Sequence, residues 1–198
     1  MDKTQLISSL QSHGFPKEIL KAFEKVPREK FIPEKYKQYA YEDTAISIGH
    51  SATISQPYTI VFMLNLLELK PKQKILEIGS GSGYVLALLS EITKGEIFGI
   101  EIIKELADKS RDILKDCKNI KIINKSGKSG LKEKAPFDRI LISASANSIE
   151  EIKPLLAQLN SSGILVAPVK NSIIKIKKQK DKITMQEFPD FVFVELKD

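Results

Sequence analysis

The chain has 198 residues, 42% of them hydrophobic, and a formal net charge of +6, which predicts one compact α/β domain and excludes global disorder. A single cysteine, Cys117, excludes an internal disulfide framework, and no apolar run approaches the ~20 residues that a membrane span needs. The N-terminal residues are too polar for a secretory signal, so we expect a cytoplasmic protein.

The positive charge is carried mainly by lysine. Of the 31 basic residues only three are arginines, and lysines cluster at residues 118–134 and 170–182. Such clusters could contact a phosphate backbone. Surfaces that bind nucleic acids usually also contain arginines and aromatic rings, and both clusters lack them. A lysine-rich solvated surface is therefore the preferred interpretation.

The N-terminal segment reads as helices followed by loops. Residues 4–12 fit a short amphipathic helix capped by Thr4, and Pro16 opens a second helix. Residues 46–55 contain glycine and serine without clear periodicity and are expected to form a loop. We expect residues 1–57 to form a cap that contributes to a substrate site.

From residue 58 onward the pattern becomes regular. A strongly apolar helix at 58–69 precedes alternating strands and helices, which predict a doubly wound, mostly parallel Rossmann-like sheet with helices on both faces and antiparallel C-terminal strands. We therefore expect residues 58–198 to form the core of a single domain. The predicted strands are 74–78, 96–100, 119–124, 137–143, 163–169, 173–178, 183–187 and 191–196, and the predicted helices are 83–93, 103–116 and 148–160.

One short segment carries the strongest functional signal. Residues 74–84 read Lys-Ile-Leu-Glu-Ile-Gly-Ser-Gly-Ser-Gly-Tyr, a strand that breaks into a glycine turn and continues as an apolar helix. Glycines let backbone N–H groups approach a ligand without interference from a Cβ. Dinucleotide sites favour G-x-G-x-x-G, whereas the tighter G-x-G-x-G after Glu77 suits a nucleoside with an amino-acid tail. Glu77 would bind the ammonium of that tail, so the segment predicts an S-adenosylmethionine pocket.

A second acidic residue supports this prediction. Glu101 ends the next predicted strand, 18 residues after Gly83 (101 − 83). A carboxylate about 20 residues beyond a glycine loop binds the paired ribose hydroxyls in nucleotide-binding folds. The alternative, in which Glu77 and Glu101 are solvated carboxylates around an ordinary turn, leaves the order of strand, loop, helix, strand and acid unexplained.

Two other segments point to one family. Val26-Pro-Arg-Glu-Lys-Phe-Ile-Pro and Gly49-His-Ser-Ala-Thr-Ile-Ser-Gln-Pro-Tyr closely resemble protein-L-isoaspartate O-methyltransferases, and the Thr-Ile-Ser-Gln-Pro string is the more specific of the two. Similarity at Gly99-Ile-Glu, Ala135-Pro-Phe-Asp and Phe191-Val-Phe-Val extends the resemblance over nearly the whole chain. The resemblance implies a class I methyltransferase that uses S-adenosylmethionine, without a metal, to methylate isoaspartyl carboxylates in damaged proteins.

The implied reaction needs few acid–base residues. An isoaspartyl carboxylate is already ionised near neutral pH, and its attack on a sulfonium methyl group depends on alignment. The resemblance implies that the Ser55 hydroxyl contacts this carboxylate; the alternative role for Ser55 is a cap for the helix that starts at Pro57. The implied cofactor-binding residues are Thr53, Ile54, Ser55, Glu77, Gly79, Ser80, Gly81, Ser82, Gly83, Glu101, Ile102, Ser126 and Gly127.

The chain also departs from the family pattern. The family's Gly-Asp-Gly after the third core strand reads Lys125-Ser126-Gly127 here. The missing aspartate normally meets the adenine edge, and the loss of such a hydrogen bond weakens binding about tenfold.

Two other functions therefore stay open. The chain could methylate a nucleic acid or a small molecule, or it could be a non-catalytic module that kept the fold. Methylation of a base amino group usually accompanies an Asn/Asp-Pro-Pro-aromatic string, and the corresponding residues here are Ser143-Ala-Ser-Ala-Asn. We therefore expect isoaspartyl proteins or peptides as substrates, no nucleic-acid or membrane partner, and a monomer.

Overall fold

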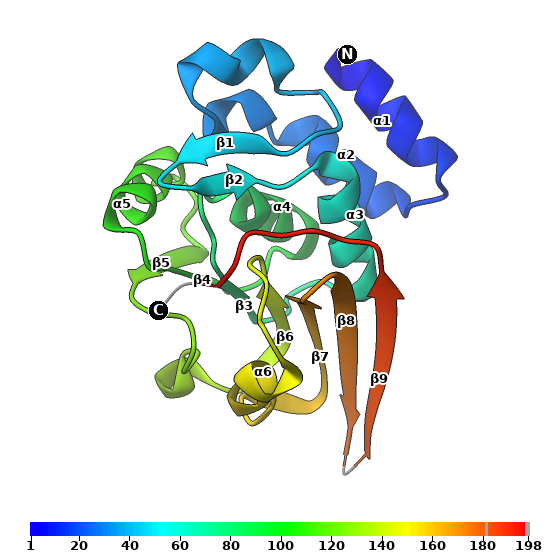
Figure 1. Cartoon of the computed structure of the whole chain (residues 1–198), viewed down its shortest axis with the longest axis vertical. Helices are drawn as coiled ribbons and strands as arrows, with labels where there is room; N and C mark the ends of the chain where they lie inside the picture. The colour runs from blue at the N-terminus through cyan, green and yellow to red at the C-terminus, as the bar shows by residue number, and fades with distance from the viewer. Residues whose placement is uncertain (181, 197–198) are drawn as a thin grey trace.

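A seven-stranded β-sheet forms the centre of the computed structural model, which describes residues 1–180 and 182–196 (Figure 1). Its strand order is β5-β4-β3-β6-β7-β8-β9, with parallel neighbours from β5 to β7 and antiparallel neighbours beyond. The expected doubly wound sheet with antiparallel C-terminal strands is confirmed. The strands are β1 Ile46–Gly49, β2 Ala52–Ile54, β3 Ile75–Ile78, β4 Ile97–Glu101, β5 Ile120–Asn124, β6 Phe137–Ile142, β7 Leu159–Val169, β8 Ser172–Gln179 and β9 Lys182–Pro189.

Helices cover both faces of this sheet. The α-helices are α1 Lys3–Ser12, α2 Lys17–Lys25, α3 Pro57–Leu66, α4 Tyr84–Thr93, α5 Lys104–Ile113 and α6 Ile149–Leu156, and the 3₁₀ turns are η1 Arg28–Phe31, η2 Glu34–Tyr39 and η3 Lys132–Lys134. α1 begins one residue earlier than expected, because Asp2 rather than Thr4 caps it in a reciprocal capping box with Gln5.

The central parallel strands are buried on both sides, which explains their near-continuous apolar sequences. Every residue of β3 and β4 is buried. One apolar cluster packs the four helices α1, α2, α3 and α4 against one face of the sheet. A second cluster packs α6 against the other face. From β3 the chain moves outward in one direction to β4 and β5, and then returns to β6 on the other side. The carboxyl ends of β3 and β6 are therefore the point where ligands bind in such sheets.

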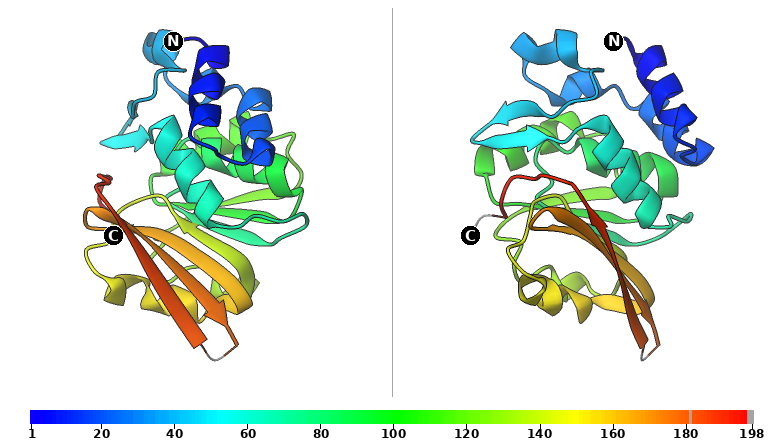
Figure 2. Two further views of the ribbon diagram at one scale, coloured as in Figure 1. Left: turned by 90° about the vertical axis from the view of Figure 1, so that its right-hand side faces the viewer. Right: turned by 45° about the vertical axis from the view of Figure 1, so that its right-hand side comes forward.

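The N-terminal elements lie beyond this end of the sheet. Figure 2 shows α1, α2 and the β1–β2 hairpin on one side of the molecule, with the β8–β9 hairpin extending away on the other. The expectation of a loop at residues 46–55 was wrong, because these residues form the antiparallel hairpin. Its turn residues His50 and Ser51 both have positive φ, as tight hairpin turns require. The usual Asn-Gly or Asp-Gly signal is absent from this turn, so the hairpin could not be recognised from the sequence.

The end of the chain also differs from the prediction. Residues 191–196 were expected to form a strand, but they make an extended segment that crosses the carboxyl ends of the strands (Figure 1). Ser145 N–H donates to Val194 O and Leu196 N–H donates to Ser145 O. The segment is therefore held by the loop after β6 instead of by a ladder along a neighbouring strand.

Candidate functional site

The glycine loop between β3 and α4 forms one wall of the site. Gly79, Gly81 and Gly83 all have positive φ, which residues with a Cβ adopt at a cost. Gly79 N–H and Ser80 N–H both donate to Ile100 O at the end of β4. Gly83 forms the N-cap of α4, and a Cβ there would lie 2.9 Å from Leu114 Cδ1. The loop is thus held closely against the sheet, and the N–H groups of Gly79, Ser80, Gly81 and Gly83 all donate within the protein.

Glu101 fixes the loop from the neighbouring strand. Its side chain is buried, and its two carboxylate oxygens accept hydrogen bonds from Gly81 N–H at 2.7 Å and Ile103 N–H at 2.9 Å. Because β3 and β4 pair in parallel, the end of β4 lies directly beside the loop. The acid that the sequence placed 18 residues downstream is thereby brought to the glycines.

Glu77 is a buried acid with half of its hydrogen-bonding capacity unused. Only 1% of its surface is exposed, Ser143 Oγ donates to Oε1 at 2.7 Å, and Oε2 has no partner among the described residues. Burial raises the pKa of Glu77 to about 8, the Ser143 hydrogen bond opposes this rise, and the nearby charge of Glu101 adds to it. Such an acid in a cavity is suited to bind a cation that would pair with its charged form.

Three adjoining cavities surround these acids. The inner cavity reaches Glu77 and Ser55, and the edge cavity reaches Glu101 and Gly127. The outer cavity lies between the start of α3 and the C-terminal segment 191–196. Thr53 and Ser143 line all three cavities. The site is therefore a continuous hollow, from the buried acid to the surface.

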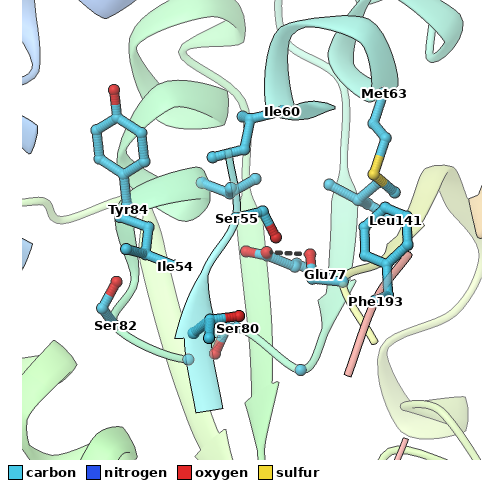
Figure 3. A pocket seen from close by; sticks show the side chains of 15 residues that line it. Ile54, Ser55, Ile60, Met63, Glu77, Ser80, Ser82, Tyr84, Leu141 and Phe193 are labelled. Carbon is cyan, nitrogen blue, oxygen red and sulfur yellow. Dashed lines mark hydrogen bonds between the residues drawn. The ribbon is translucent and has the colours of Figure 1, made fainter. Parts of the chain in front are cut away.

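Ser55 lies where the inner and outer cavities meet. Figure 3 shows the side chains of Ser55 and Glu77 pointing toward one another in the inner cavity. The proposed capping role for Ser55 was wrong, because Gln56 is the N-cap residue of α3 and Asp43 Oδ1 accepts the hydrogen bond from Tyr58 N–H at 2.8 Å. The Ser55 hydroxyl is therefore not required by the helix.

The structure gathers most residues that the sequence suggested. Gly83 and Ser126 are not among the residues that line the cavities: Gly83 caps α4, and Ser126 is half-buried in the turn before Gly127. The inner cavity is lined by Thr53, Ile54, Ser55, Glu77, Gly79, Ser80, Gly81 and Ser82, and the edge cavity by Thr53, Gly79, Gly81, Glu101, Ile102 and Gly127.

Several residues were missed. Ser143 follows β6, Tyr84 and Phe193 line the inner cavity, and Glu195 lines the edge cavity. The only available signal for Ser143 was its position at the end of a strand beside the switch point. Phe193 and Glu195 gave no local signal, because only the path of residues 191–196 brings them to the site.

The described part of the chain contains no cluster of three or more histidine, cysteine, aspartate or glutamate side chains that could hold a metal. It also contains no helix with the length and apolar character of a membrane span.

A doubly wound sheet with a glycine loop after its first core strand, and an acid after the second, defines a Rossmann-like protein that binds a nucleoside ligand. The family model described as protein-L-isoaspartate(D-aspartate) O-methyltransferase matches residues 1–198, and the chain belongs to this family.

Individual relatives agree with this assignment. The chain is 37% identical over 199 residues to protein-L-isoaspartate O-methyltransferase of Methanococcoides burtonii, with 96% of this chain and 97% of the relative covered. It is 41% identical over 202 residues to that of Flavobacterium psychrophilum, with 98% and 93% covered.

Solved structures show the same fold. One protein-L-isoaspartate O-methyltransferase, 23% identical, superposes with a TM-score of 0.91 over all of this chain and 66% of its own. A second structure, described as a protein-L-isoaspartate O-methyltransferase of Plasmodium falciparum in complex with S-adenosyl-L-homocysteine, is 28% identical, with a TM-score of 0.84 and 100% and 99% of the two chains covered.

Proposed function

We propose that this chain is a protein-L-isoaspartate(D-aspartate) O-methyltransferase, which transfers a methyl group from S-adenosyl-L-methionine to the free carboxylate of L-isoaspartyl residues in damaged proteins. Family membership over the whole chain supports this function. The observation that carries it is the placement of Ser55 between a buried acid and the outer cavity. A carboxylate entering from the surface would meet the hydroxyl before it reached the donor.

The residues present fit the methyl donor. Glu77 Oε2 is buried without a partner among the described residues, and an ammonium group would supply one. Glu101 lines the edge cavity, where it would accept hydrogen bonds from the ribose hydroxyls, and the glycine loop between these acids lines both the inner and the edge cavity. When bound, the donor supplies an activated methyl group on a sulfonium centre.

The protein's own contribution to the reaction is alignment. The acceptor carboxylate is ionised near neutral pH, so no proton has to be removed. Among the residues that the structure describes, no histidine or cysteine lines the three cavities. In the proposed mechanism Ser55 donates a hydrogen bond that orients the carboxylate, and the apolar side chains of Ile60, Met63 and Phe193 exclude water from the inner cavity. Holding two reactants in line can lower a barrier by several kcal/mol.

The product is a methyl ester that needs no further help from the protein. The ester cyclises to a succinimide when the neighbouring backbone nitrogen displaces methanol. Hydrolysis of the succinimide returns part of it to a normal aspartyl residue. The overall result is repair of an isomerised peptide bond.

Residues 1–57 would act as the cap of this site, and residues 58–198 as its Rossmann-like core. Thr53 and Ser55, at the end of the N-terminal segment, support this division because both line the outer cavity. We also propose that the protein acts as a monomer. We further propose a cytoplasmic location, no nucleic-acid partner and no metal.

The test is a methylation assay with a synthetic isoaspartyl peptide, its normal aspartyl twin and labelled S-adenosylmethionine. We expect alkali-labile methyl ester on the isoaspartyl peptide alone. No ester on either peptide, together with donor binding in a calorimeter, would contradict the proposal and leave another acceptor or a non-catalytic binding module. No donor binding at all would leave only a module that has lost the cofactor.

A further inference from the structure

Arg28 is a buried cation directly behind the residue proposed to orient the substrate. None of its surface is exposed, and it lies in η1, in the segment before the β1–β2 hairpin. Its Nη2 atom donates to Ser55 O at 2.9 Å, and its guanidinium carbon lies 5.2 Å from the centre of the Tyr84 ring. Burial lowers the pKa of Arg28 to about 10, so the group remains charged at neutral pH.

This arrangement is costly for a purely structural residue. Nε and Nη1 of Arg28 are buried and have no partner among the described residues. A buried charge with unused donors destabilises a fold unless another requirement retains it. The contacts of the Arg28 guanidinium in the structure are the carbonyl oxygens of Ser55 and Thr44 and the Tyr84 ring, and the shorter hydrogen bond is the one to Ser55 O.

Asp43 holds the start of α3, directly after Ser55. Its Oδ1 atom accepts from Tyr58 N–H at 2.8 Å, and its Oδ2 atom accepts from Gln56 Nε2 at 3.1 Å. Asp43 thus takes over the capping of α3, which a residue next to the helix normally performs. Arg28 therefore holds the backbone of Ser55 and Asp43 holds the residues that follow it, while the Ser55 hydroxyl is left for the cavity.

We propose that Arg28 and Asp43 are positioning residues: Arg28 holds the carbonyl oxygen of Ser55, Asp43 holds the start of α3 that follows it, and together they set the direction of the Ser55 hydroxyl toward the substrate carboxylate. This inference rests on the proposed function. Neither residue lines the inner, edge or outer cavity, so each acts through the residues it contacts: Arg28 through Ser55 and Tyr84, and Asp43 through the start of α3. Displacement of an aligned group by about 1 Å can reduce a rate by about a hundredfold.

The experiment measures kcat with an isoaspartyl peptide, and the affinity for S-adenosylhomocysteine by calorimetry. Arg28→Lys keeps the charge but loses the planar fork, and we expect kcat to fall about tenfold to a hundredfold, with donor affinity within about twofold of wild type. Asp43→Ala should lower kcat similarly, and Asp43→Asn, which retains a capping oxygen, should restore it.

Arg139 provides a matched control. It is also buried, and it donates to the carbonyl oxygens of Leu67 and Glu68 at the opposite end of α3. Arg139→Lys should lower the melting temperature and leave kcat unchanged. A fall in kcat for Arg139→Lys equal to that for Arg28→Lys would overturn the inference, since any loosening of α3 would then suffice.

A double mutant separates positioning from stability. If Arg28 acts through Ser55, Arg28→Lys has no further effect on kcat once Ser55 is alanine. If the reductions in kcat of the two single mutants multiply in the double mutant, the inference is wrong. It is also wrong if Ser55→Ala keeps the kcat of wild type, because the direction of the Ser55 hydroxyl would then not matter. If Arg28→Lys fails to fold, as checked by circular dichroism, the Asp43 variants in the same Ser55→Ala cycle decide the question. Absence of peptide methylation by the wild-type protein is a different result, and it removes the proposed function itself.

Discussion

Ser143, directly after β6, donates a hydrogen bond of 2.7 Å to Oε1 of Glu77 on the neighbouring strand β3, and so leaves Oε2 of this buried carboxylate as the open position of the inner cavity. The two residues are 66 positions apart in the chain. Because β3 and β6 are neighbours in the sheet, Ser143 binds one carboxylate oxygen of Glu77 and the other oxygen stays available to a ligand.

Glu77 predicts a specific dependence of stability on pH. Its pKa is raised to about 8 in the folded protein, whereas an unfolded glutamate ionises near 4.5. Between these values the folded state holds a proton that the unfolded state has released, so the free energy of unfolding decreases as pH rises from about 4.5 to about 8. Thermal unfolding across this range should show the decrease in wild type, and Glu77→Gln should lack this contribution. Identical pH profiles for both proteins would contradict the assignment.

The same residue predicts proton release when the donor binds. An ammonium beside Glu77 favours the ionised carboxylate, so binding at pH 7 should release up to about one proton, and affinity should rise as pH approaches 8. Calorimetry in buffers with different ionisation enthalpies measures this proton. Glu77→Gln should bind about tenfold to a hundredfold more weakly and release none. Binding by wild type without any proton release would argue against an ammonium at this position.

Glu101 should be essential for donor affinity. Glu101→Ala removes the acceptor of the Gly81 and Ile103 N–H groups together with the proposed contacts to both ribose hydroxyls. Hydrogen bonds to charged groups contribute about 1.5–3 kcal/mol each, so affinity should fall about a hundredfold or more. Glu105→Ala, an exposed acid on α5, is the control and should bind normally. Unchanged affinity in Glu101→Ala would place the nucleoside elsewhere.

Ser126 offers a gain of function. If the family's aspartate at this position meets the adenine edge, Ser126→Asp should tighten donor binding about tenfold. Ser129→Asp adds the same charge to an exposed position of the same loop and should leave affinity unchanged. Equal tightening in both variants would show an effect of net charge and not of position.

Gly127 should tolerate no side chain. A Cβ at this position would lie 2.2 Å from Cγ2 of Ile78, a buried residue at the end of β3. Forcing a methyl group into a filled core costs about 1–3 kcal/mol, so Gly127→Ala should lower the melting temperature by about 2–10 °C and weaken donor binding. Ser129→Ala serves as the control. A melting temperature equal to that of wild type would show that Ile78 can move and make room for the added methyl group.

The parts of the site that were predicted correctly depend on neighbours in the chain. The glycine loop was recognisable because a strand, three residues able to adopt positive φ and an apolar helix follow one another without interruption. Glu101 was recognisable because a single βαβ unit carries it to the loop. Backbone preference and short-range topology determine both features.

The parts that were missed depend on packing between distant segments. Asp43 caps α3 although it lies 14 residues (57 − 43) before the helix begins, so Ser55 is not needed as the cap. His50 and Ser51 form the turn of the β1–β2 hairpin, and neither residue type predicts a hairpin turn. Residues 191–196 have the composition of a strand, but Ser145 holds them across the site instead.

By itself the amino-acid order determined the alternating architecture, the ligand loop with its two acids and the resemblance to one enzyme family, since each arises from preferences that act over a few residues or within one βαβ unit. Only the folded chain decided which hydroxyl is left unused, which oxygen of Glu77 stays open and which arginine lies behind Ser55. Those choices follow from close packing of segments far apart in sequence, where burial and hydrogen-bond satisfaction outweigh local propensity.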